Sequence, residues 1–245
     1  MSTLIEVKNI GISFGGIQAV KDVSFKIEKG EILGLIGPNG SGKSTCVNLI
    51  AGVYPVDHGE IWFRNELIKP TLGIASRAKL GIGRTFQSSR PFGNLSVYEN
   101  IYTIALQSHP PKQAAEATEA ILTFMGMEED KNTLSAKLSI QKRKWLDLAR
   151  ILATGAEFIM MDEVMAGLTP TEMEESAALV NRLQAEYGKT ILFIEHVMKA
   201  VIAVCHRCVV LNEGQVLSEG IPEDVLQRPD VIAAYLGGGS RNAVN

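Results

Sequence analysis

The strongest structural signal in the sequence is Gly37-Pro38-Asn39-Gly40-Ser41-Gly42-Lys43-Ser44-Thr45. It matches the pattern G-x-x-x-x-G-K-[ST] in full, with an apolar run before it and a helical pattern after it. Glycines let the backbone turn its N–H groups toward phosphate oxygens, and the following helix places its positive end there. We therefore predict that the whole stretch binds a nucleotide phosphate chain, that Lys43 reaches the terminal phosphates and that the Ser44 hydroxyl ligates Mg²⁺.

Strand and helix patterns surround this loop. The first third favours short strands, and the middle has apolar residues three and four apart, as in helices. The last third alternates strand and helix, which predicts an α/β fold with a mostly parallel sheet covered on both faces. The expected strands are 4–14, 23–27, 32–36, 60–63, 157–161 and 190–194, and the expected helical regions are 113–150 and 171–187.

The composition narrows the function classes. Lys and Arg total 24 against 27 for Asp and Glu, a net charge of −3, which argues against a nucleic-acid partner. No apolar run is long enough to span a bilayer, and the N-terminal residues lack the apolar region of a signal peptide. We expect a soluble cytoplasmic protein whose role at a membrane, if it has one, comes through a partner.

Further candidate site residues follow later strands. Asp162 and Glu163 come directly after the apolar run F-I-M-M, so Asp162 is predicted to hold Mg²⁺ and Glu163 to polarise an attacking water. His196 follows the next strand and is predicted to reach the γ-phosphate. Gln87 lies in R-T-F-Q-S, between the strand-rich and helical parts, where it can contact Mg²⁺ or water and report the nucleotide state to the helices.

Taken together, these motifs resemble the ABC ATPase family in order and spacing, over nearly the whole chain. The resemblance implies ATP and Mg²⁺ as cofactors, and a P-loop fold with a mixed sheet core, an N-terminal antiparallel β subdomain and a helical subdomain. It implies a single domain over 1–245, with 1–87 and 156–245 as the nucleotide-binding core and 88–155 as the helical signature subdomain. It also implies that an aromatic ring, here Phe14, stacks on adenine.

The finer resemblance is to ATPase subunits of branched-chain amino acid transporters. It is carried by G-I-G-R-T-F-Q, N-L-S-V-Y-E-N, A-G-L-T-P-T-E and the ending P-D-V-I-A-A-Y-L-G. It implies the ATP-hydrolysing motor of an importer for branched-chain amino acids or a related small polar solute. Its partners would be a second ABC ATPase subunit and membrane permease subunits, with a solute-binding protein only indirectly involved. The chain would lie peripherally on the cytoplasmic face of the inner membrane.

One segment departs from the family pattern. The family signature L-S-G-G-Q, which caps the ATP held by the opposite subunit, corresponds here to L-S-I-Q-K at 138–142. Ser139 can still donate to a phosphate, but Gln141 replaces a glycine that lets the backbone approach the γ-phosphate. We therefore expect an asymmetric pair with a different ATPase chain, and a slow enzyme if the chain pairs with itself. The alternative is a soluble or regulatory ABC-type nucleotide-binding protein with weak hydrolysis.

Overall fold

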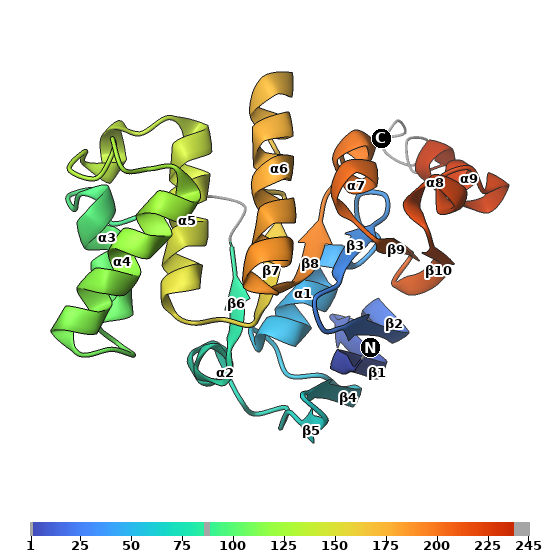
Figure 1. The fold of residues 1–245 in the computed structure, drawn as a ribbon. Helices are drawn as coiled ribbons and strands as arrows, with labels where there is room; N and C mark the ends of the chain where they lie inside the picture. Colours follow the sequence, from blue (N-terminus) through green and yellow to red (C-terminus); the bar gives the residue numbers. More distant parts are fainter. Residues whose placement is uncertain (1, 86–88, 238–245) are drawn as a thin grey trace.

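Two β-sheets form the frame of the computed structural model, which describes residues 2–85 and 89–237 (Figure 1). The smaller sheet is antiparallel, with strand order β2-β1-β4-β5. The larger sheet has the order β10-β9-β3-β8-β7-β6, and only its β9–β10 pairing is antiparallel. The strands are β1 (Thr3–Phe14), β2 (Ile17–Glu28), β3 (Ile32–Ile36), β4 (His58–Phe63), β5 (Glu66–Leu67), β6 (Ile82–Arg84), β7 (Phe158–Asp162), β8 (Thr190–Ile194), β9 (Arg207–Asn212) and β10 (Gln215–Gly220).

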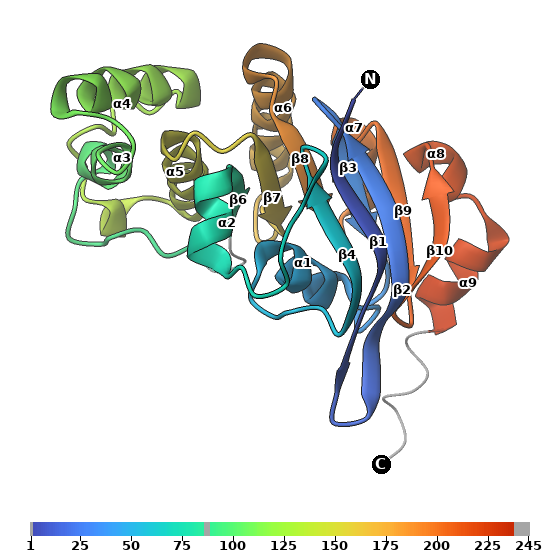
Figure 2. The ribbon, with the colours of Figure 1, turned by 90° about the horizontal axis from the view of Figure 1, so that it is seen from below.

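The helices occupy three places around the sheets. Helix α1 lies between the two sheets, α6 and α7 cover the other face of the larger sheet, and α3, α4 and α5 form a group to one side (Figures 1 and 2). The bounds are α1 (Lys43–Ala51), α2 (Ile74–Leu80), α3 (Val97–Ala105), α4 (Pro111–Met125), α5 (Ile140–Ala153), α6 (Pro170–Tyr187), α7 (Met198–Val204), α8 (Pro222–Val225) and α9 (Pro229–Gly237), with a 3-10 turn η1 at Ser135–Lys137.

The buried strands of the larger sheet separate two hydrophobic cores. Along β3, Ile32 and Ile36 face the core under α6 and α7, whereas Leu33 and Leu35 face the core around α1. Successive side chains of a strand point to opposite faces, so a strand buried on both faces is apolar throughout. The sheet therefore holds the ends of β3, β7 and β8 side by side, and the predicted site residues follow these ends.

Local signals explain where the helices begin and end. Helix α6 starts with a capping box between Thr169 and Glu172, has Pro170 at its first position and ends at Gly188 with φ 58°. The predicted helical region 113–150 is two helices, because Gly126 with φ 64° ends α4. In the smaller sheet, β2 starts at Ile17, earlier than predicted, and it pairs with β1 through several register shifts.

The predicted fold class is confirmed: a mixed sheet core, an N-terminal antiparallel sheet and a helical group are all present. Ser89, just after the undescribed residues, already contacts α5 of the helical group, since its hydroxyl donates to the Arg143 carbonyl. The proposed boundaries at 88 and 155 remain a prediction. Among the described residues, no helix is both long and apolar enough to cross a membrane.

Candidate nucleotide site

The loop between β3 and α1 depends on glycines in conformations that other residues rarely adopt. Gly37 has φ 148° and Gly42 has φ 103°. A Cβ atom on Gly37 would lie 2.1 Å from the Leu211 carbonyl oxygen, and one on Gly42 would lie 2.6 Å from the Ala19 carbonyl oxygen. These positions therefore need glycine both for backbone conformation and for space. Gly42 is also the N-cap of α1, which has no side-chain cap.

Lys43 is folded back along the loop. Its Nζ donates to the carbonyl oxygens of Gly37 at 2.7 Å and Pro38 at 3.0 Å, and the residue is 8% exposed. Burial lowers the pKa of the Lys43 ammonium group, while the nearby carboxylates of Glu163 and Asp162 act in the opposite direction. The ammonium thus stands at the base of the loop, held by carbonyl groups that an anion would replace.

A cavity of about 500 Å³ opens over this loop. The buried Ser41 hydroxyl, which borders it, has no hydrogen-bond partner among the described residues. An unpaired buried hydroxyl is costly, so a polar ligand in the cavity would satisfy it. The lining residues are Ile17, Gln18, Ala19, Lys21, Asn39, Gly40, Ser41, Gly42, Lys43, Ser44, Thr45, Glu163, Glu213 and Gly214.

Asp162 ends β7 beside the loop and is held by a cation. Arg84 Nη2 lies 2.9 Å from its Oδ2, and both side chains are largely buried. Arg84 Nη1 also donates to the Asn48 side chain of α1 at 2.6 Å, and the Asp162 amide donates to the Thr85 hydroxyl at 3.0 Å. The carboxylate is therefore fixed in place, with one oxygen engaged by Arg84.

Glu163 and His196, which follow neighbouring strands of the sheet, lie close together. His196 Nδ1 lies 3.9 Å from Glu163 Oε1, and the His196 side chain is exposed. Glu163 lines the cavity and has φ 49°, a conformation that is unusual for a residue other than glycine. Gln87, the third predicted catalytic residue and a predicted Mg²⁺ ligand, lies outside the described residues.

Phe14 lies near the tip of the β1–β2 hairpin, outside the cavity lining. Its ring packs edge-to-face against Tyr54 with centroids 5.2 Å apart. Ile17, on the other side of the hairpin turn, does line the cavity and is 74% exposed. Stacking of Phe14 on adenine stays a prediction, and Ile17 is a second apolar candidate that the sequence analysis missed because it contains no aromatic ring.

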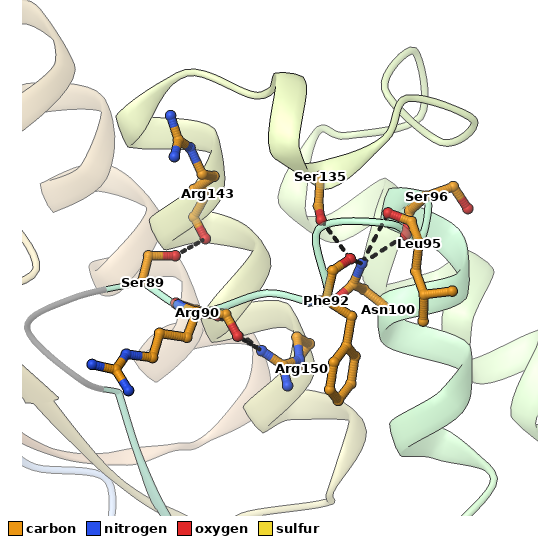
Figure 3. Close-up of polar contacts among 10 residues, drawn as sticks. Ser89, Arg90, Phe92, Leu95, Ser96, Asn100, Ser135, Arg143 and Arg150 are labelled. Carbon is orange, nitrogen blue, oxygen red and sulfur yellow. Dashed lines mark hydrogen bonds and ion pairs between the residues drawn. The ribbon is translucent and has the colours of Figure 1, made fainter.

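The segment after the undescribed residues is anchored to the helical group (Figure 3). Arg150 Nη1 donates to the Arg90 carbonyl at 3.1 Å, and the Arg150 guanidinium lies over the Phe92 ring. The fully buried Asn100 accepts from the Phe92 amide at 2.8 Å and donates to carbonyls of the same segment. Residues 90–92 are therefore tied to both α3 and α5.

The signature segment is engaged within its own chain. Ser139 caps α5, accepting from the Lys142 amide at 3.2 Å, and the Lys142 ammonium pairs with Asp130 at 2.6 Å. Gln141 is 7% exposed and donates to the Glu175 carboxylate of α6 at 2.8 Å. A hydroxyl can accept and donate at once, so Ser139 keeps a donor for a phosphate. The large exposed side chain here is Ile140, at 56%.

Two charged residues near Glu163 escaped the sequence analysis. Lys144 of α5 donates to the Glu163 and Ala166 carbonyls, and Glu195, between β8 and His196, accepts from the Met165 amide. Both act on backbone groups of the segment after β7, and such contacts leave no motif in a sequence. For Glu195 the sequence does give one indication of a role, because a carboxylate lies between an apolar strand and the predicted catalytic His196.

The chain is similar to known ATP-binding transport proteins along nearly its whole length. The family model for ABC transporters matches residues 20–166, and the model for branched-chain amino acid ATP-binding cassette transporters matches residues 215–240. The chain is 34% identical to the high-affinity branched-chain amino acid transport ATP-binding protein LivG of Salmonella typhimurium, over 96% of this chain and 98% of that protein. It is 32% identical to the lipopolysaccharide export system ATP-binding protein LptB of Escherichia coli, over 97% and 98%.

Solved structures show the same architecture. An ATP-binding cassette of an ABC transporter in its ADP conformation superposes with a TM-score of 0.87 at 30% identity, over 97% of this chain and all of that one. A dimeric cassette in a post-hydrolysis state, bound to ADP and Pi, gives a TM-score of 0.77 at 25% identity, over 89% of this chain and 99% of that one.

The chain therefore belongs to the ABC transporter family, as one of its ATP-binding cassettes. As a member of that family it is an ATPase, and it binds ATP and ADP. Among the solved relatives, one cassette is a dimer in its post-hydrolysis state, and another, CbiO1 of Clostridium perfringens, is part of an ABC transporter complex. The predictions of an ABC ATPase and of a resemblance to the branched-chain amino acid transporter subunits are confirmed.

Proposed function

We propose that this chain is the ATP-hydrolysing motor of an importer for branched-chain amino acids or a related small polar solute. One observation carries the choice of solute class: residues 215–240, which include β10, α8 and α9, match the branched-chain family model. This segment begins just after Gly214, the last residue in the sequence that lines the cavity. It contains none of the predicted nucleotide ligands. Its similarity is therefore not explained by the need to bind ATP.

In the proposed mechanism, residues of the loop bind the phosphates and Glu163 acts on water. Backbone N–H groups of the loop and Lys43 hold the β- and γ-phosphates, and Glu163, at the cavity edge, orients and polarises the attacking water. His196, whose Nδ1 lies 3.9 Å from Glu163 Oε1, is proposed to contact the γ-phosphate. The carboxylate and the imidazole thus act on the same phosphate from neighbouring strand ends.

The residues present fit a Mg²⁺ ion bound with the nucleotide. The exposed Ser44 hydroxyl lines the cavity, and Asp162 lies at the end of the adjacent buried strand. Both supply the hard oxygen ligands that Mg²⁺ prefers, and Gln87 is the predicted third contact. Mg²⁺ bound there would neutralise charge on the β- and γ-phosphate oxygens. Since Arg84 holds one Asp162 oxygen, we expect Asp162 to contact the ion through its other oxygen or through water.

We also propose that the second ATPase subunit is a different chain. In this model the ATP on Lys43 is completed by the partner's signature, and L-S-I-Q-K faces the partner's ATP. Gln141 is directed into its own chain toward Glu175, and Lys142 is paired with Asp130. These bonds turn Gln141 away from a phosphate and leave the Ser139 hydroxyl and the remaining N–H groups of Lys142 as side-chain donors, which supports a weaker second site.

The surface that would receive the permease is a pair of adjoining hollows beside β6. They measure about 170 and 180 Å³, and Arg84, Ile151 and Thr154 line both. The larger share of their lining is apolar, including Ile74 of α2. We propose that a cytoplasmic helix of a permease subunit docks here, which would place the chain on the cytoplasmic face of the inner membrane. Arg84 then contacts both this surface and Asp162.

A regulatory nucleotide-binding protein with weak hydrolysis is the second candidate, and the internally bonded signature favours it. The first experiment is steady-state ATP turnover of the purified chain across protein concentration, with Glu163→Gln as the blank. Cooperative turnover that vanishes in the blank would show a self-paired motor and overturn the asymmetric pair. ATP binding without turnover above the blank would support a different partner or the regulatory role.

Uptake in the source cells then decides between these two. We would replace the chain by Glu163→Gln and measure initial uptake of radiolabelled leucine, isoleucine and urea. Lys189→Arg is a matched control, because Lys189 is also partly buried but donates to the Ala156 carbonyl, away from the nucleotide cavity. Loss of uptake of one solute in Glu163→Gln alone would support the importer and name its solute. Unchanged uptake of all three would contradict the proposed solute class.

A further inference from the structure

The segment after β7 folds into a tight turn whose two ends are bridged by a lysine. The Ala166 amide donates to the Glu163 carbonyl at 3.2 Å. From α5, Lys144 Nζ donates to the same Glu163 carbonyl at 3.3 Å and to the Ala166 carbonyl at 2.5 Å. One ammonium group therefore holds the first and last residues of the turn together, and the first of them carries the proposed catalytic carboxylate.

A buried carboxylate holds the same turn. Glu195 is fully buried, and its Oε1 accepts from the Met165 amide at 2.7 Å. Its Oε2 is also buried and has no hydrogen-bond partner among the described residues. Burying a carboxylate is costly, and a single backbone hydrogen bond repays only part of that cost. The Glu195 carboxylate is costly to bury, and it is hydrogen-bonded to the turn that begins with Glu163. This combination indicates that Glu195 positions the turn.

The charges of the two residues are related. Burial lowers the pKa of Lys144, and the carboxylates of Glu195 and Glu163 act against that shift. Burial raises the pKa of Glu195, and the Met165 amide and His196 act against that shift. Burial thus disfavours the charged form of both Lys144 and Glu195, and neighbouring groups favour that charged form.

The turn needs such support because its first residue is strained. Glu163 has φ 49°, a conformation that is costly for a residue with a side chain. Strain of this kind persists only where the surroundings impose it. The Glu163 amide is fixed by the Ile194 carbonyl at 2.9 Å, and Lys144 fixes the Glu163 carbonyl. The backbone that aims the Glu163 side chain is therefore held on both sides.

We propose that Lys144 and Glu195 are positioning residues that clamp the turn 163–166 and so aim the Glu163 carboxylate, which links α5 to the catalytic centre of the same chain. This rests on the proposed role of Glu163. Ser139 of the signature is the N-cap of helix α5, so a shift of the signature moves Lys144 and, through its two hydrogen bonds, the turn. The engagement of this chain's signature by a partner is thereby transmitted to its own site.

The first test is single-turnover ATP hydrolysis by the full chain at high protein concentration, together with its ATP affinity. We expect Lys144→Met to slow hydrolysis about 10- to 100-fold, because small misplacements of a reacting group cost that much. The ATP dissociation constant should change less than about twofold, since Lys144 does not line the nucleotide cavity. Lys144→Arg should restore part of the rate. Lys189→Met is the control, because Lys189 is a partly buried lysine that donates to the Ala156 carbonyl instead.

The second test reads the turn directly and needs no hydrolysis. Hydrogen exchange of the Met165 amide should quicken in Glu195→Ala and in Lys144→Met, and should stay near the original rate in Glu195→Gln, which keeps an acceptor oxygen, and in Lys189→Met. If Lys144→Met fails to fold, Glu195→Ala tests the clamp from the opposite side.

The outcomes separate this inference from the role of Glu163. Full hydrolysis by Glu163→Gln would overturn the proposed role of Glu163, and the positioning role with it. An inactive Glu163→Gln beside unchanged hydrolysis in Lys144→Met and Glu195→Ala would overturn the positioning role alone. Equal losses in Lys144→Met and Lys189→Met would also overturn it, because they would show a general effect of removing a buried lysine.

Discussion

The N-termini of α1 and α5 differ in how their first backbone amides are capped. At α1 the N-cap is Gly42, which has no side chain, so the first amides of the helix are left for a ligand. At α5 the N-cap is Ser139, whose hydroxyl accepts from the Lys142 amide. The first terminus is built to be completed by phosphate, whereas the second is already completed by its own chain.

This difference teaches which half of an ATP site each region can supply. The loop before α1 brings a ligand-sized cavity, an unpaired buried Ser41 hydroxyl and a lysine resting on carbonyl groups. In the first turn of α5, by contrast, Gln141 is bonded to Glu175 and Lys142 to Asp130. Under the proposed asymmetric pairing, such a chain binds its own nucleotide fully and contributes less to its partner's.

The largest effect on ATP hydrolysis should come from removing the positive charge of Lys43. Lys43→Met should reduce ATP hydrolysis by about 10³-fold or more, because the only buried ammonium among the described residues lining the cavity is lost at the phosphates. Fluorescent-nucleotide titration and steady-state turnover measure it, and Lys189→Met serves as the matched control. A Lys43→Met variant that binds and hydrolyses normally would mean that the loop does not hold the phosphates.

The next largest effect is expected from two glycine substitutions. Together they distinguish a steric clash of the new Cβ atom from the cost of a positive φ. Gly42→Ala places a Cβ atom 2.6 Å from the Ala19 carbonyl oxygen, whereas Gly40→Ala meets nothing within 4 Å. Both have positive φ, so each should lose about 1 kcal/mol or more of stability. Only Gly42→Ala should also lose most ATP binding, because relief of its clash moves the loop. Chemical denaturation and nucleotide titration give the two readouts, and equal ATP affinities would contradict the clash argument.

A smaller effect is expected at the signature, where Gln141→Gly should have opposite consequences for stability and rate. The free energy of unfolding should fall by about 2 kcal/mol, since the bond to Glu175 is lost and glycine weakens the helix. Turnover of the self-paired chain should rise by up to about tenfold, equivalent to about 1.4 kcal/mol of transition-state stabilisation. Urea unfolding and concentration-dependent turnover measure these changes. Unchanged turnover would show that Gln141 is not what weakens this signature.

The smallest effect should come from removing the cap of α5. Ser139→Ala should lower the free energy of unfolding by about 1 kcal/mol, the usual value of an N-cap. Ser139→Asp keeps an acceptor and should retain stability, yet it places a negative charge where the partner's phosphates would come. Thermal unfolding measures the first change, and turnover in the paired state measures the second. Turnover of Ser139→Asp equal to the original would argue against any contact between Ser139 and a phosphate.

Local sequence predicted the parts of this molecule whose physics is local. The loop at 37–45, β3 and β8 could be predicted because a glycine-rich loop and a buried apolar run each define their own conformation. The placement of Glu163 beside His196 followed from adjacent strand ends. These features need no knowledge of distant residues.

What could not be predicted depends on contacts between distant segments. Gln141 points at Glu175, more than thirty residues away on α6. Lys144 and Glu195 act on carbonyl and amide groups that every residue possesses, so their targets have no sequence signature. Phe14 matched the expected spacing of an adenine-stacking ring, but its environment depends on how Tyr54 packs against the hairpin.

Gly214, in the turn between β9 and β10, limits how freely this protein can be recombined with its relatives. Its amide donates to the Ser41 carbonyl at 3.0 Å, and its own carbonyl accepts from the Lys21 amide at 2.7 Å. The segment that matches the branched-chain model starts at the very next residue. A chimera joined at this point would alter the phosphate loop unless it kept the glycine and its φ of 81°. The end of the chain that distinguishes one transporter subfamily from another is therefore not an interchangeable module, because it is joined to the rest of the chain through Gly214, which is hydrogen-bonded to the phosphate loop.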